Sequence, residues 1–171
     1  MMTAFVLFSF MLYFPYGWCA LAGEPRDSYG LIWEASSQAL RDVAAAAAIT
    51  LVPLTALSLY YFSSRLPSPE AGTAFSQVLS GLAAAVAEET FFRGWLQTLL
   101  KRRLSSLGAI FLASALFGLA HLASPNAPFA LLAFFPGLVM GFLRDRHGSV
   151  LPAILYHWIG NIWSVWFYPG F

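Results

Sequence analysis

Apolar residues along the chain gather into long, nearly uninterrupted runs, and short segments between them carry most of the charge. The first 23 residues contain no charged side chain. About 20 consecutive apolar residues are enough for a helix to cross the hydrocarbon core of a membrane. We therefore predict about six membrane-spanning helices, at residues 1–23, 43–62, 73–100, 105–123, 129–143 and 150–168.

The connections between these runs contain turn-forming and charged residues. Residues 63–72 hold two prolines and a glycine, residues 124–128 read SPNAP, and residues 144–148 read RDRHG. Such segments favour turns over helix. A signal peptide is the alternative for the first run, but no basic residue precedes it and it is longer than a signal core. We interpret it as a retained helix.

The basic residues are distributed unevenly over the predicted connections. Of the nine Lys and Arg residues, seven fall in 24–42, 101–103 and 144–146, which six alternating spans place on one side. Arg65 falls on the other side, and Arg93 lies inside a span. Basic loops of membrane proteins face the cytoplasm. We expect this side to be cytoplasmic and both termini to face outward.

Composition agrees with a membrane location. The chain is 59% hydrophobic and 10% charged, whereas soluble domains are about half apolar and about a quarter charged. A net charge of +1 argues against nucleic acid as a partner, and the single Cys19 cannot form an intramolecular disulfide. We predict an all-α, polytopic transmembrane helical bundle, one domain over residues 1–171. The compact size favours a prokaryotic plasma membrane, with the lipid bilayer as the surrounding partner.

A few strongly polar residues lie inside the predicted spans. Each costs about 2.5–3.5 kcal/mol at the centre of a membrane helix, so such residues persist where they pair or take part in chemistry. They are Glu88, Glu89, Arg93, His121, His157 and Asn161. Counted from the basic side at about 1.5 Å per residue, Glu88, His157 and Asn161 lie roughly 13–19 Å deep, and His121 roughly 20–24 Å. The sequence thus predicts a polar layer near mid-membrane.

Helical spacing indicates which of these residues share a face. Glu89 and Arg93 are four residues apart and can pair, whereas Glu88 lies about 100° further round the helix. His157 and Asn161 also share one face.

Each of these residues except Glu88 has a structural explanation. Phe117 stands four residues before His121, which places its ring beside the imidazole. His121 and Asn161 could join helices by hydrogen bonds, and the Glu89–Arg93 pair could be purely structural. An unpaired carboxyl in lipid has no such role, so Glu88 is the strongest functional candidate.

Three short motifs follow one another on successive spans. Residues 88–93 read EETFFR, residues 117–121 read FGLAH and residues 157–161 read HWIGN, which give EExxxR, FxxxH and HxxxN. In this order they resemble the three motifs of the CPBP family (CAAX protease and bacteriocin-processing), which includes Rce1-like CAAX prenyl endopeptidases and Abi-type bacterial relatives. The resemblance covers residues 80–163, the expected catalytic core.

The resemblance implies an intramembrane glutamic endopeptidase. Glu88 would be the general base that activates a water together with His121, and His157 and Asn161 would stabilise the oxyanion. Glu89 and Arg93 would hold the third span in place and tune Glu88.

A metal is the alternative to a glutamate-activated water. Two histidines and a carboxylate, here Glu88, His121 and His157, also form a possible zinc set. The resemblance favours no metal and no other cofactor.

The substrate implied is a membrane-associated protein or peptide. It is either a CAAX C-terminus or a hydrophobic sorting tail or bacteriocin leader, and the sequence does not decide between them. Two other classes are open: a non-enzymatic immunity or scaffold protein of the same fold, and a small proton-coupled transporter. The intact motifs argue against the scaffold. The single polar layer and the lack of a sequence repeat argue against the transporter.

Overall fold

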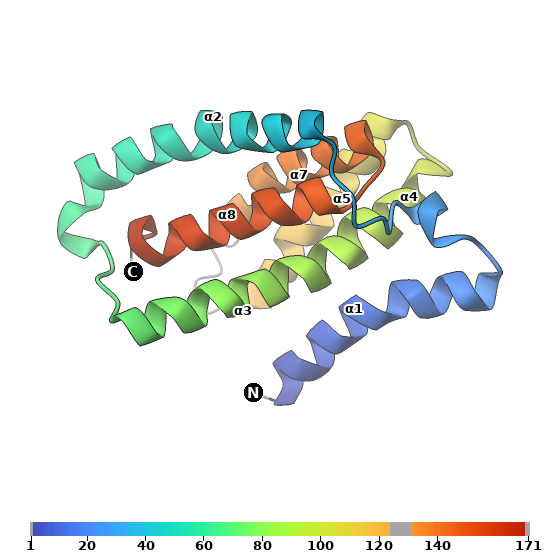
Figure 1. Cartoon of the computed structure of the whole chain (residues 1–171), viewed down its shortest axis with the longest axis horizontal. Coiled ribbons are helices and arrows are strands. Elements are labelled where there is room, and N and C mark those ends of the chain that lie inside the picture. The colour runs from blue at the N-terminus through green and yellow to red at the C-terminus, as the bar shows by residue number, and fades with distance from the viewer. Residues whose placement is uncertain (1, 124–130, 170–171) are drawn as a thin grey trace.

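Six long helices lie side by side in a bundle (Figure 1). The computed structural model describes residues 2–123 and 131–169. The long elements are α1 (Met2–Ala22), α2 (Ser37–Phe62), α3 (Ala71–Glu89), α5 (Ser106–Ala120), α7 (Phe134–His147) and α8 (Leu151–Phe167). A π-helical segment (Thr90–Leu96) joins α3 to the short α4 (Gln97–Lys101). Single 3₁₀ turns cover Arg26–Tyr29, Ser63–Arg65, His121–Ala123 and Leu131–Ala133. The described part of the chain contains no strand, which confirms the predicted all-α class.

The helices begin and end where local signals place them. Ser36 accepts a hydrogen bond from the Ala39 amide, and Ser105 accepts one from Gly108, so both serines cap the helices that follow them. Gly148 adopts a φ of +65°, which favours glycine and ends α7. The predicted turn at residues 124–128 lies outside the described residues.

Several details of the helix prediction were wrong. The helix α2 begins at Ser37 instead of residue 43, because Ser36 caps it. The prediction had started the helix only after the charged residues Arg41 and Asp42.

The helix α7 begins at Phe134, after the 3₁₀ turn Leu131–Ala133, instead of at residue 129. The helix α7 continues to His147, so Arg144 and Arg146 lie in its last turn, where basic side chains complement the helix dipole. The third helix is not α-helical throughout, since the π-helical segment interrupts it.

The helix α8 lies between α2 and α3 and contacts both (Figure 1). The helices α5 and α7 pack on each other, and α7 also packs on α8. The helix α1 lies against α3 and the π-helical segment, on the side away from α2. The three motifs lie on α3 and the π-helical segment, at the end of α5 and on α8.

The outer helices expose large apolar side chains. Phe5–Ala22 and Ser37–Arg65 are long and apolar enough to cross a membrane, and only 17% and 11% of these two stretches is buried. Length and composition alone are weak grounds for a span, but a soluble core helix would be mostly buried. The helix α5 is apolar but shorter, at 15 residues. The six-span topology stays a prediction.

The three basic segments predicted to share one side do meet at one end of the bundle. Ion pairs join these segments: Arg102 with Glu24, Lys101 with Asp145, and Arg146 with Asp42. Hydrogen bonds from the Arg102 guanidinium hold the pKa of the Glu24 carboxyl below its ordinary value. We call this region, with residues 24–42, 101–103 and 144–146, the basic end. Its placement in the cytoplasm remains an expectation.

Two buried side chains connect α7 to the third helix, which consists of α3, the π-helical segment and α4. Arg93 donates from Nη2 to the carbonyl of Gly137 at 3.1 Å, and Gln97 donates from Nε2 to the carbonyl of Gly141 at 3.1 Å. Both donors are fully buried. Because each glycine has no side chain, the donors reach the α7 backbone directly.

Replacing Gly141 with alanine is expected to destabilise the bundle by about 1–3 kcal/mol, the usual cost of overpacking. The added Cβ would lie 2.8 Å from Ile110 Cγ2 and 3.2 Å from Gln97 Oε1. Thermal unfolding of the purified protein in detergent measures the loss. Gly17→Ala is the matched control, because no atom lies within 4 Å of its added Cβ. Equal unfolding temperatures for the two variants would contradict the close packing of α7.

Candidate active site

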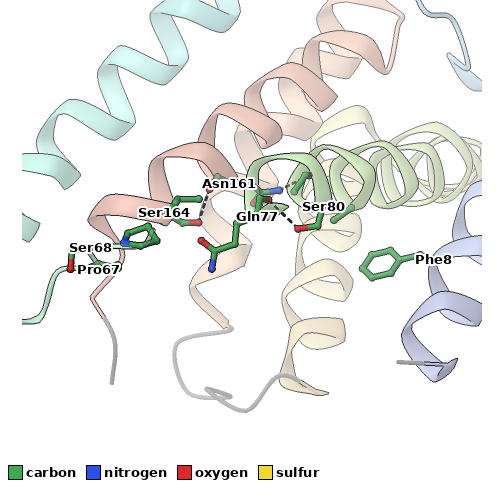
Figure 2. Close-up of a pocket in the computed structure, with 11 residues that line it drawn as sticks. Phe8, Pro67, Ser68, Gln77, Ser80, Asn161 and Ser164 are labelled. Atoms are coloured by element: carbon green, nitrogen blue, oxygen red, sulfur yellow. Dashed lines mark hydrogen bonds between the residues drawn. The ribbon is translucent and has the colours of Figure 1, made fainter. Parts of the chain in front are cut away.

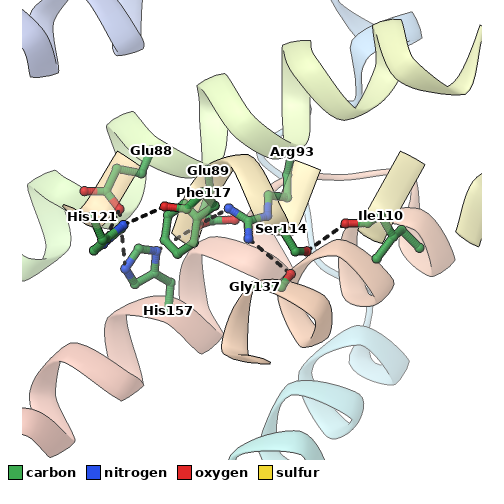
Figure 3. Close-up of polar contacts among 9 residues, drawn as sticks. All are labelled: Glu88, Glu89, Arg93, Ile110, Ser114, Phe117, His121, Gly137 and His157. Carbon is green, nitrogen blue, oxygen red and sulfur yellow. Dashed lines mark hydrogen bonds and ion pairs between the residues drawn. The ribbon is translucent and has the colours of Figure 1, made fainter. Parts of the chain in front are cut away.

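The three motifs meet in the interior of the bundle (Figure 3). Glu88 and Glu89 are the last residues of α3, immediately before the π-helical segment. His121 follows the last residue of α5, and His157 lies within α8. A π-helical segment adds backbone that shifts the side-chain register, and such segments are frequent at functional sites.

Both histidines present Nε2 to the same carboxylate oxygen. Glu88 Oε2 lies 3.8 Å from His157 Nε2 and 4.0 Å from His121 Nε2. These distances are too long for direct hydrogen bonds. Glu88 Oε2 is buried and has no hydrogen-bond partner within the described part of the chain. Three groups that the sequence placed on separate helices therefore converge on one point.

The second ring nitrogen of each histidine is held by an acceptor. His121 Nδ1 lies 2.9 Å from the Phe117 carbonyl, and His157 Nδ1 lies 2.8 Å from Glu89 Oε1. A carbonyl and a carboxylate only accept, so both Nδ1 atoms carry a proton. In the neutral rings both Nε2 atoms are then acceptors that face an acceptor oxygen of Glu88. At least one proton, shared among these groups, relieves that repulsion.

Glu89 and Arg93 form the ion pair that their spacing predicted. Arg93 Nη1 lies 3.3 Å from Glu89 Oε1, and both side chains are fully buried. The same oxygen accepts from His157, so Glu89 joins α8 to the third helix. This second contact was not predicted, because the sequence does not show which neighbour α8 presents to Glu89.

The Phe117 ring lies among the charged and polar groups of the site. Its centroid is 4.5 Å from that of His121 and 5.8 Å from that of His157. The Arg93 guanidinium lies 4.3 Å from the same centroid, a cation–π contact. The predicted contact between Phe117 and His121 is confirmed, and the ring also contacts Arg93 and His157.

We call Glu88, His121 and His157 the Glu88 cluster. The hydrogen bond of the Asn161 side chain is to a group outside this cluster. It lies one turn beyond His157 and donates from Nδ2 to the Gly81 carbonyl on α3 at 2.9 Å. A Cβ on Gly81 would lie 3.0 Å from Asn161 Cβ, so this glycine allows the contact. An amide group has two donor hydrogens, and Gly81 uses one of them.

Glu88, His121 and His157 have the donor types that zinc prefers. Among residues 2–123 and 131–169, however, no group of three or more His, Cys, Asp or Glu side chains has an arrangement that could hold a metal ion. The residues as placed do not fit a metal, and we derive no step through one.

Fold and site together define an all-helical protein with an ionisable centre between α3, α5 and α8. The family model described as type II CAAX prenyl endopeptidase, Rce1-like, matches residues 70–163, just over half of the chain and all three motifs. The chain belongs to this family, which is membrane-integral and whose members are CAAX-type endopeptidases. The predicted resemblance is confirmed. No curated protein and no solved structure matches the chain.

Proposed function

We propose that this protein is an intramembrane endopeptidase that hydrolyses a peptide bond with a water activated by Glu88. The observation that carries the proposal is the convergence of two imidazole Nε2 atoms on Glu88 Oε2. One water can bridge polar atoms separated by this distance with hydrogen bonds of normal length. The Glu88 carboxylate then serves as the general base.

The steps follow from the groups present. Glu88 takes one proton from the water as the water oxygen attacks the scissile carbonyl carbon. The carbonyl oxygen becomes an oxyanion, which accepts hydrogen bonds from His157 and from the second Nδ2 hydrogen of Asn161. When the intermediate collapses, the C–N bond breaks and the leaving nitrogen takes the proton from Glu88. The products are a new carboxyl terminus and a free amine.

The protonation states of the two histidines differ in this mechanism. His157 donates from Nε2, so its ring carries both protons, and the Glu89 carboxylate at Nδ1 stabilises that charge. His121 stays neutral, because its Nδ1 faces only the Phe117 carbonyl, and its Nε2 accepts from the attacking water. The different partners at Nδ1 thus support different roles.

Membership of the family favours a membrane-associated protein or peptide as the substrate. A CAAX-type C-terminus and a hydrophobic sorting tail remain the two candidates. In both candidate substrates the scissile peptide bond lies close to the bilayer. The Glu88 cluster lies between apolar helices, where such a bond could reach it. A prokaryotic plasma membrane is the proposed location.

Purified wild-type protein is expected to cleave a membrane-associated C-terminal tail, and a strong zinc chelator is expected not to change the rate. His157→Ala should abolish cleavage, because it removes an oxyanion donor. Mass spectrometry of the peptide products measures both results. Loss of activity on chelation, restored by added zinc, would instead make Glu88, His121 and His157 metal ligands. Failure to cleave any tail would favour the scaffold protein.

A further inference from the structure

A cavity of about 680 Å³ is lined by residues of α1, α3, α8 and the loop before α3 (Figure 2). Glu88, His121 and His157 are not among its lining residues. Its volume is within the range of ligand-binding pockets. Polar and apolar groups share its lining, which includes Phe8, the loop 67–69, Gln77, Ser80, Asn161 and Ser164. We call this cavity the α3–α8 groove.

The α3–α8 groove leads to the reactive residues. Ala84 lines it and lies one helical turn before Glu88 on α3. Asn161 lines it from α8 and lies one turn after His157. Its outer end is formed by the loop 67–69, which connects α2 to α3 at the end of the bundle opposite the basic end. The groove therefore runs from that loop toward Glu88.

The interior on the other side of Glu88 is filled. Arg93 and Gln97 are fully buried there and hydrogen-bond to the backbone of α7. Beyond them lie the ion pairs of the basic end. A polypeptide that approached from the basic end would have to break these hydrogen bonds and ion pairs.

We infer that the substrate polypeptide lies extended in the α3–α8 groove and reaches Glu88 from the end of the bundle opposite the basic end. This inference rests on the proposed function. Gln77 and Ser80 are exposed on the wall of the groove, where a peptide backbone offers donors and acceptors that match them. A lipid acyl chain has no such groups.

Single-cysteine labelling tests the direction of access without requiring catalysis. In full-length Cys19→Ala protein in sealed vesicles, Gln77→Cys and Arg103→Cys are expected to react with a membrane-impermeant maleimide from opposite sides. Ser64→Cys is the matched control, because it is exposed beside the same loop and does not line the groove. Reaction of Gln77→Cys from the same side as Arg103→Cys would overturn the inference.

Occupancy is tested with a synthetic membrane-associated tail peptide. The peptide is expected to slow labelling of Gln77→Cys and not of Ser64→Cys. Equal protection of both, or a Gln77→Cys that vesicle lipid alone shields from both sides, would rule out a peptide groove. With wild-type activity established, Gln77→Ala should raise KM about fivefold at unchanged kcat, the effect of one lost neutral hydrogen bond. If the wild type cleaves no tail, the proposed function fails, while labelling still decides the groove.

Discussion

Replacing Glu88 with glutamine is expected to abolish peptide cleavage without weakening the fold. Glutamine has the same shape but cannot take a proton from water, so kcat should fall by about 10²–10⁴-fold, the contribution of a general base. Cleavage of a membrane-associated tail by the purified variant measures the loss. The exposed Glu34→Gln is the control, and it should cleave at the wild-type rate.

The stability of the Glu88→Gln variant distinguishes a catalytic role of Glu88 from a structural one. Glu88 Oε2 is buried without a hydrogen-bond partner among the described residues, so the wild-type carboxyl is itself costly. A neutral amide at this position should leave the unfolding temperature unchanged or raise it, as is common when an active-site residue is replaced. An inactive Glu88→Gln that also unfolds easily would mean that the residue is structural.

Contacts between neighbouring residues of the candidate site could be predicted from the sequence because the motifs have helical spacing. Four-residue intervals placed Glu89 beside Arg93 and Phe117 beside His121, and both contacts are present. Interval arguments work within one helix, where 3.6 residues per turn fix the neighbours. The uneven distribution of basic residues similarly predicted the three segments that meet at the basic end.

Contacts between different helices could not be predicted from the sequence. The contact of His157 with Glu89 depends on how α8 rotates against α3, which no interval within either helix determines. The π-helical segment after Glu89, which contains Arg93, was also not predicted from the sequence. The hydrogen bond from Asn161 to the carbonyl of Gly81 on α3 likewise joins two helices and was not predicted.

Replacing Glu89 with glutamine is expected to lower both activity and stability, in contrast to Glu88→Gln. The change leaves the fully buried Arg93 without its counter-charge, and breaking a buried ion pair by removing one partner costs about 3–5 kcal/mol. It also removes the carboxylate that stabilises protonated His157. Unfolding of the purified variant in detergent, measured beside tail cleavage, gives both effects.

The double variant Glu89→Gln/Arg93→Met separates these two causes. It removes both charges, so it should be more stable than Glu89→Gln alone, as expected where an uncompensated charge dominates the loss. Its activity should stay low, because His157 still lacks the Glu89 carboxylate at Nδ1. Activity restored together with stability would show that Glu89 serves only to neutralise Arg93. Stability restored without activity would establish that Glu89 acts on the reaction through His157, a role that helical spacing alone did not predict.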